Sequence, residues 1–392
     1  MRLFLVLLVL PLALGCDSTS PGCKMPFDVL AVVVHVNGDV ENSFPVNWGP
    51  LGRQNVTASN VRMSHAGGRF LFLSMDRVGL LFDLRTGALV QEVNYSRALS
   101  ADPFEERLLE SFYPLEPYTL PNGVHVFNLH PAWADLRAIS VGGPTEVLVR
   151  DTMELVNPLL VRFSHPQTAL GLPGGDVLYS HWTYAYQASP DSLGTRFTVS
   201  LFDSDWRLFR LNARTNTARR LLSLPGEPTW MHTDTLGRLV SFFVNQDHYI
   251  ADLEANTLRK SEAPVRWYIP SPDGRYLLGQ LLDETTVVQD VASGRMWPVN
   301  GGNGRPLPTP VFGPDDNLYF KLTREDSIGV WRVPVTEPTG MAHAEPVWLA
   351  APVLKEAGIS DQPLKSSSPL FLDDDQFVML YGAQNSRTPI CR

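Results

Sequence analysis

The chain has 392 residues, of which 44% are apolar and 19% charged, with a formal net charge of −9. This composition excludes a disordered chain and a small disulfide scaffold, because it supplies ample apolar material for a packed core. The negative charge argues against a nucleic-acid partner, since phosphate binding needs a basic surface. The 29 Gly and 32 Pro residues favour a chain with many turns over a helical bundle.

Residues 1–15 have the pattern of a secretory signal peptide. One arginine precedes an apolar run, Leu3 to Leu14, that is too short to span a bilayer comfortably. The run ends at Gly15-Cys16, which resembles the lipobox of bacterial lipoproteins, whose cysteine is acylated and becomes the mature N-terminus. The resemblance implies lipidation at Cys16, a tether over residues 16–26, and attachment to a membrane of the bacterial cell envelope, facing the periplasm or the exterior. The alternative is an ordinary signal peptide cleaved nearby, with Cys16 incidental.

Two further cysteines, Cys23 and Cys391, lie near the two ends of the chain. In an exported, oxidising compartment two such thiols are expected to form a disulfide. The chain-entropy model assigns roughly 5 kcal/mol of stabilisation to closing so long a loop. Two unrelated free thiols are the alternative.

Residues 27–392 contain an internal repeat that predicts the fold. Each copy is an extended stretch, a Gly or Asp turn and a second apolar stretch, with turns near Gly68, Gly123, Gly175, Gly237, Gly274, Asp316 and Asp374. A second turn follows in several copies, with Asp at its first position and Gly or Asn at its fifth, as in Asp83–Gly87, Asp252–Asn256 and Asp290–Gly294. Gly or Asn accepts the positive φ of a tight hairpin there. Each unit therefore holds four short antiparallel strands, which is the blade of a β-propeller.

The repeat predicts an all-β fold: a seven-bladed β-propeller of four-stranded antiparallel blades. The run Ser271–Leu277 (SPDGRYL) and the Asp-to-Gly turns resemble WD-like repeats and the TolB propeller. Little chain follows the last turn, so we expect Phe27–Val36 (FDVLAVVVHV) to supply an N-terminal strand that closes the ring.

The longer spacings between turns require insertions. One covers Asn94–Leu120, with a short helix predicted at Phe104–Phe112. The others cover Thr183–Arg196 and Ala350–Ser368, the last with a helical turn at Val353–Gly358.

Three arginines, Arg62, Arg162 and Arg266, occupy equivalent places in their repeats. In WD-like blades this strand is innermost, so the three guanidinium groups would converge on the central channel and bind an anion. Alternatively, each arginine pairs with a carboxylate between blades.

His65 and His165 align in the copies that hold Arg62 and Arg162, and His232 lies at nearly the same place in the copy with the turn at Gly237. Such histidines could hold a metal, but histidines that are hydrogen-bonded within a turn are commoner. The Asp-rich turns at Asp315–Asp316 and Asp373–Asp375 could bind calcium, but solvated turns of this kind are commoner. We therefore expect no metal and no cofactor.

Aromatic residues cluster at His181–Tyr186, at the start of one insertion. Inserted loops often carry function, which makes Trp182, Tyr184 and Tyr186 a candidate binding surface. Packing over a blade edge is the alternative.

The sequence lacks a nucleophile elbow, a P-loop, a dinucleotide fingerprint and zinc-ligand spacing. We expect a monomeric, lipid-anchored envelope propeller that binds an envelope protein or a glycan without catalysis. The alternative is a propeller enzyme (hydrolase, lyase or quinoprotein-like oxidoreductase) with an anionic substrate at the central channel, since propellers host both classes.

Overall fold

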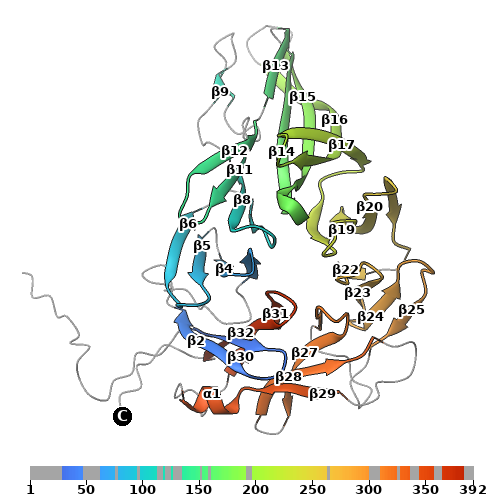
Figure 1. Cartoon of the computed structure of the whole chain (residues 1–392). Helices are drawn as coiled ribbons and strands as arrows, with labels where there is room; N and C mark the ends of the chain where they lie inside the picture. The colour runs from blue at the N-terminus through green and yellow to red at the C-terminus, as the bar shows by residue number, and fades with distance from the viewer. Residues whose placement is uncertain are drawn as a thin grey trace, which may run out of the picture.

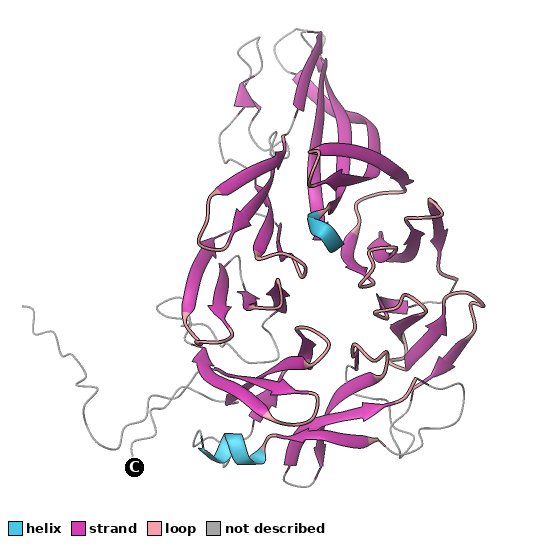
Figure 2. Cartoon of the chain, viewed as in Figure 1, coloured by secondary structure: helices cyan, strands magenta, loops and turns pink. Residues whose placement is uncertain are grey.

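The computed structural model describes residues 29–46, 62–75, 78–94, 98–112, 118–119, 125–126, 135–150, 152–157, 160–190, 197–262, 265–299, 310–324, 327–335, 344–356 and 364–383. Seven antiparallel sheets form a ring, as Figure 1 shows. The ring is built almost wholly of strands (Figure 2). The predicted seven-bladed β-propeller is therefore confirmed. The predictions at Cys16, Cys23 and Cys391 lie outside the described residues.

The blades follow one another along the chain, and their strands run from the inside of the ring outward. Blade 1 holds β3 (Arg62–Ala66), β4 (Phe70–Met75), β5 (Val78–Asp83) and β6 (Leu89–Asn94). Blade 2 holds β7 (Ala98–Ala101), β8 (Arg107–Phe112), β11 (Asp135–Ser140) and β12 (Thr145–Val149). Blade 3 holds β14 (Leu160–Gly171), β15 (Val177–Pro190), β16 (Phe197–Asn212) and β17 (Thr217–Leu224), with β13 (Thr152–Asn157) paired to the start of β14.

The second half of the chain continues the ring. Blade 4 holds β18 (Thr229–Thr233), β19 (Leu239–Val244), β20 (Asp247–Asp252) and β21 (Thr257–Lys260). Blade 5 holds β22 (Val265–Pro270), β23 (Tyr276–Leu281), β24 (Thr286–Asp290) and β25 (Met296–Pro298). Blade 6 holds β26 (Val311–Phe312), β27 (Leu318–Arg324), β28 (Ser327–Val333) and β29 (Glu345–Leu349).

Blade 7 joins the two ends of the chain. It combines β30 (Leu364–Ser366), β31 (Leu370–Phe371) and β32 (Gln376–Ala383) with β1 (Val29–His35) and β2 (Val40–Val46). Strand β1 pairs with β32 on one side and β2 on the other, so the N-terminus supplies two strands where we predicted one. Ring closure by an N-terminal strand is confirmed.

Both faces of β1 are buried, which explains its unbroken apolar sequence. Val32 faces the cluster shared with blade 6, which includes Tyr319 and Trp348. Val33 faces the cluster shared with blade 1, which includes Leu71 and Leu73. The closing strand is thus part of two inter-blade cores.

Six of the seven predicted turns join the innermost strand of a blade to its next strand: those at Gly68, Gly175, Gly237, Gly274, Asp316 and Asp374. The second turns also form as predicted, with positive φ at Gly87, Asn256 and Gly294. The prediction for blade 2 is wrong. Its turn is Asp102–Glu106, whereas Gly123 falls between the short strands β9 (Tyr118–Thr119) and β10 (His125–Val126), outside the described residues.

The helix predicted at Phe104–Phe112 is also wrong, because that segment contains strand β8. Leu108 packs between blades 1 and 2, and Leu109 packs between blades 2 and 3. Two adjacent apolar residues on opposite buried faces hide the alternation that identifies a strand. The helical turn near Val353 is confirmed as α1 (Ala351–Glu356). In the described ranges, no helix has the length and hydropathy needed to cross a bilayer.

The turns after the innermost strands contact one another around one face of the ring. The Gly67 amide donates to the Asp102 carbonyl, 3.1 Å away, which joins blades 1 and 2. The Thr235 amide donates to the Pro272 carbonyl at 3.0 Å, which joins blades 4 and 5. Because these turns share one face, the innermost strands all begin at the opposite face.

Candidate functional site

The register of the strands separates the three predicted arginines. Arg62 on β3 pairs opposite Ser74, four residues before the blade turn begins at Ala66. Arg266 on β22 lies at a similar level in blade 5. Arg162 on β14 instead pairs opposite Ala185, in the part of blade 3 that extends beyond the ring at the top of Figure 1. The structure therefore does not bring Arg162 together with the other two.

Two of these arginines are paired with carboxylates of their own blades. The Arg162 guanidinium lies 3.5 Å from the Glu154 carboxylate and 3.4 Å from that of Asp203. Arg266 lies 3.4 Å from the Glu284 carboxylate and donates to the Leu282 carbonyl at 3.0 Å. Their positive charges are balanced by carboxylates, as in the alternative from the sequence, but within one blade and not between blades.

Arg62 has a different neighbour. Its guanidinium carbon lies 5.7 Å from the ring centroid of Trp230 on β18, within cation–π range. Blades 1 and 4 lie on opposite sides of the ring, so this contact spans the central axis near the face where the innermost strands begin. Among the described residues no carboxylate forms an ion pair with Arg62. The donor edge of this guanidinium is thus available to an anion.

A β-bulge positions Trp230. Thr229 pairs opposite Phe243 and His232 pairs opposite Ser241, so two residues, Trp230 and Met231, oppose the single residue between. Met231 is buried in the core between blades 3 and 4. Trp230 is 65% exposed and has a φ of 56°, in the left-handed region that disfavours bulky residues.

The strained conformation of Trp230 brings no packing benefit. A left-handed conformation costs a residue with a Cβ about 1–2 kcal/mol, and an exposed indole recovers little of this by burial. Bulges frequently re-aim a side chain at functional sites, and local strain concentrates at such sites. We therefore treat Arg62 and Trp230 as the candidate site and call them the Arg62–Trp230 pair.

The sequence drew attention to Arg62 but not to Trp230 as a site residue. Nothing in the local sequence marks a bulge in which Trp stands where Gly would be favoured.

The predicted aromatic surface is not a surface. Trp182 and Tyr184 on β15 are 8% and 0% exposed and form the interior of the blade 3 extension. Trp182 stacks on Trp206 with ring centroids 5.1 Å apart, and its indole nitrogen donates to Ser204 Oγ at 2.8 Å. The burial of Trp182 and Tyr184 corrects the prediction for those two residues, and the side chain of Tyr186 lies outside the described residues.

The structure also separates the three aligned histidines. His165 is buried in the blade 3 extension, edge-on to Trp182. His65 lies beside its turn, where its Nδ1 accepts from the Gly68 amide at 3.2 Å, and burial lowers its pKa to about 4. His232 lies near His248 of β20. Within the described residues no group of three His, Cys, Asp or Glu could hold a metal ion.

His248 predicts a pH dependence of stability. Burial first, and the nearby His232 second, lower the pKa of His248 to about 3. An unfolded chain binds a proton at this residue below about pH 6.5 and the folded chain does not, so stability is lost as the pH falls from 6.5 toward 3. Between pH 8 and pH 5 the free energy of unfolding of the native chain should fall by about 2 kcal/mol more than that of the His248→Phe variant.

Urea unfolding of both chains at the two pH values measures this difference. The Phe variant is a suitable reference because the imidazole packs against the Tyr268 ring, 4.6 Å away, and the Phe243 ring, 5.1 Å away. All other titrating groups are common to the two chains. Equal losses in both chains would contradict the prediction.

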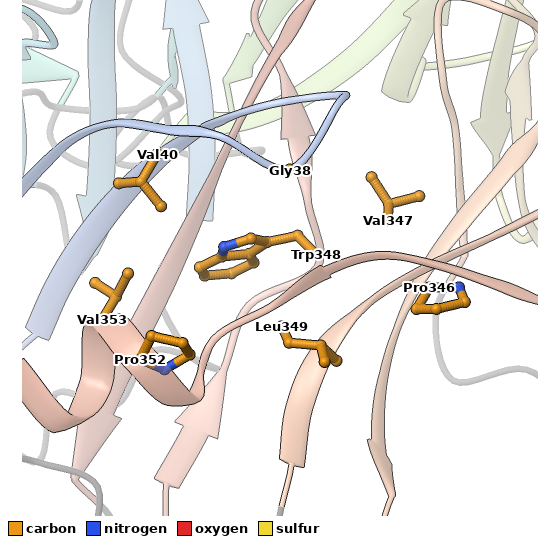
Figure 3. A pocket seen from close by; sticks show the side chains of 8 residues that line it. All are labelled: Gly38, Val40, Pro346, Val347, Trp348, Leu349, Pro352 and Val353. Carbon is orange, nitrogen blue, oxygen red and sulfur yellow. The ribbon is translucent and has the colours of Figure 1, made fainter.

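An apolar groove of about 460 Å³ lies at the outer edge of the ring, between the start of β2, strand β29 and helix α1 (Figure 3). Its lining residues are Gly38, Val40, Pro346, Val347, Trp348, Leu349, Pro352 and Val353. This lining offers no acid–base side chain, so we do not assign the groove a chemical role.

Comparison with known proteins supports no assignment of family. No protein-family model matches the sequence, and neither does any curated protein sequence. Among solved structures, the chain is similar to a eukaryotic initiation factor (9% identity, TM-score 0.36, covering 81% of this chain and 85% of that one). It is similar to the dihydro-heme d1 dehydrogenase NirN (12% identity, TM-score 0.41, covering 82% of this chain and 73% of that one). It is also similar to an oligogalacturonate lyase (12% identity, TM-score 0.31, covering 72% of this chain and 90% of that one). Similarity at this level assigns no function.

Proposed function

We propose that this protein is an envelope-anchored propeller that binds a partner, a glycan or an envelope protein, without catalysis. The observation that carries the proposal is the Arg62–Trp230 pair, in which a strained bulge holds an exposed indole against a guanidinium that forms no ion pair with any described residue. Exposed Trp and Arg residues are the side chains that most often dominate binding energy. The pair thus supplies an aromatic face for stacking and hydrogen-bond donors for an anion at the centre of the ring.

The anchor in this proposal derives from the N-terminal sequence. The apolar run that ends at Gly15-Cys16 supports export and lipidation at Cys16, and pairing of Cys23 with Cys391 would fasten the chain ends beside blade 7. The acidic chain, with its net charge of −9, fits a partner other than nucleic acid.

An enzyme acting on an anionic substrate would use Arg62 equally well, but it would also need an acid or base beside Trp230. The nearest titratable group on that strand is His232, whose pKa burial lowers to about 4. A base with so low a pKa is weak at neutral pH. This favours binding over acid–base catalysis.

A photo-crosslinker at Thr229 in the native host tests the proposal. Thr229 is exposed and adjacent to Trp230, so the probe samples the site and leaves the indole in place. We expect a partner adduct on irradiation and, in the same digest run without reductant, a diacylated N-terminal Cys16 peptide and a linked Cys23–Cys391 peptide.

Two controls decide the result. The same probe at Leu349, an exposed position on the outer strand β29, should give no such adduct, and Trp230→Gly should abolish the adduct at Thr229. Equal adducts at both positions, or adducts that persist without Trp230, would refute binding at the pair. An unacylated N-terminus beginning elsewhere would refute the anchor.

A further inference from the structure

The exposed indole of Trp230 is a flat apolar surface whose exposed neighbours include polar side chains. Its neighbour on the strand, Thr229, is exposed, and the adjacent innermost strand presents the exposed Arg266. A stable protein interface has a broad apolar centre, whereas Trp230 offers one ring. Such a site suits a polar ligand with a single apolar face, as a pyranose ring has on its C–H side. The negative face of the indole attracts those polarised C–H groups.

Arg62 adds a charge requirement. Its planar guanidinium presents several N–H donors in a fixed fork that fits a carboxylate in bidentate fashion. Within the described part of the chain no ion pair occupies this fork, whereas Arg162 and Arg266 are each paired. The ligand that satisfies both groups carries a carboxylate on its ring.

The pair must open to admit the ring. A separation of 5.7 Å between guanidinium and indole centroid is a contact distance and leaves no space for a ring between them. Opening an exposed cation–π contact costs a factor of about 2 to 5 in the equilibrium constant. A bidentate carboxylate bond returns roughly 10-fold or more. Arg62 therefore leaves the indole and takes the carboxylate while the sugar stacks on Trp230.

We propose that the Arg62–Trp230 pair is a subsite for a uronic acid unit of an acidic polysaccharide. This inference rests on the binding function proposed above and names the chemical class of its ligand.

Ligand-observed saturation-transfer NMR on the full chain tests the proposal with methyl glucuronide and its neutral counterpart methyl glucoside. We expect methyl glucuronide to bind about 10-fold more tightly. Arg62→Met should remove this preference, and Arg62→Lys should keep part of it. Trp230→Gly should weaken both ligands by about 10-fold or more, and Trp230→Phe should retain a stacking face. Arg266→Lys, the matched change at a paired arginine, should leave both affinities within about 2-fold.

Folding of the variants can be checked separately. Because Trp230 is exposed and Gly adopts a positive φ without strain, Trp230→Gly should unfold at the same urea concentration as the native chain or a higher one. Loss of binding in this variant is then loss of the site.

Several outcomes would overturn the proposal. Equal affinity for the two sugars, or an unchanged preference in Arg62→Met, would exclude a carboxylate subsite. Benzoate that binds as tightly as methyl glucuronide, with the same dependence on Trp230, would show selection of any ring carboxylate. No sugar binding combined with a Trp230-dependent protein adduct at Thr229 would overturn this inference and leave the proposed binding function standing. Failure of both experiments would refute both.

Discussion

Replacing Val32 by Asp will lower the free energy of unfolding by more than about 4 kcal/mol, because it places an unpaired charge inside an inter-blade core. Val32 is 0% exposed, lies between β32 and β2, and packs in the cluster that joins blades 6 and 7. A loss of this size approaches the whole stability of many domains. Urea unfolding followed by far-UV circular dichroism will measure it.

Val40→Asp is the matched control. Val40 lies on β2 of the same blade but is 40% exposed, so the same new charge remains in water and should cost about 1 kcal/mol or less. Similar losses in the two variants would show that β1 does not close the ring.

Removing the Asp102 side chain will have the second largest effect. Asp102 is 0% exposed, and its carboxylate accepts from the Phe104 amide at 3.0 Å and from Arg107 Nε at 2.8 Å. Arg107 also donates to the Gly175 carbonyl at 2.6 Å, which links blade 2 to blade 3. Asp102→Ala leaves the largely buried guanidinium without its counter-ion and should cost about 3–5 kcal/mol.

Asp252→Ala tests a second Asp-stabilised turn, at a half-buried position between β20 and β21. The Asp252 carboxylate accepts from the amides of Glu254 and Ala255 at 3.0 and 2.8 Å but has no buried cation to balance. We expect Asp252→Ala to lower the free energy of unfolding by about 1 kcal/mol, as removal of a capping side chain does elsewhere. The urea concentrations at the midpoints of unfolding compare the two variants. If Asp102→Ala lowers stability no more than Asp252→Ala does, the proposed role of the buried Asp102–Arg107 ion pair is contradicted.

Asp102 also explains which parts of the fold could be predicted from the sequence. The blade turns at Gly68, Gly237 and Gly274 have positive φ values, which Gly accommodates without strain, so composition reveals them. The blade 2 turn relies instead on the Asp102 carboxylate bonding the backbone at Phe104. Residues 102–106 contain no glycine, so this turn carries no glycine signal, and Gly123 was assigned in its place.

The candidate site could be predicted only in part, for a related reason. Aligning Arg62 with Arg266 succeeded because both lie a few residues before their turns. Arg162 was misaligned because β14 and β15 lengthen blade 3 beyond the ring, which shifts its register. The same lengthening buries Tyr184, and a bulge exposes Trp230. Each of these outcomes depends on pairing between strands, which local sequence does not record.

The pairing of β1 with β32 also determines the order in which the molecule can fold. His35 and Asp375, 340 positions apart, meet through their side chains at the end of this strand pair. Strand β1 therefore cannot complete its pairing until β32 has been synthesised, and such high contact order slows folding. Until then VLAVVVH, an uncharged β-branched segment, can pair with β2 along one edge, but its other edge lacks a partner. That open edge is a template for aggregation during the interval, so the arrival of β32, rather than the local pairing with β2, ends the period of greatest risk.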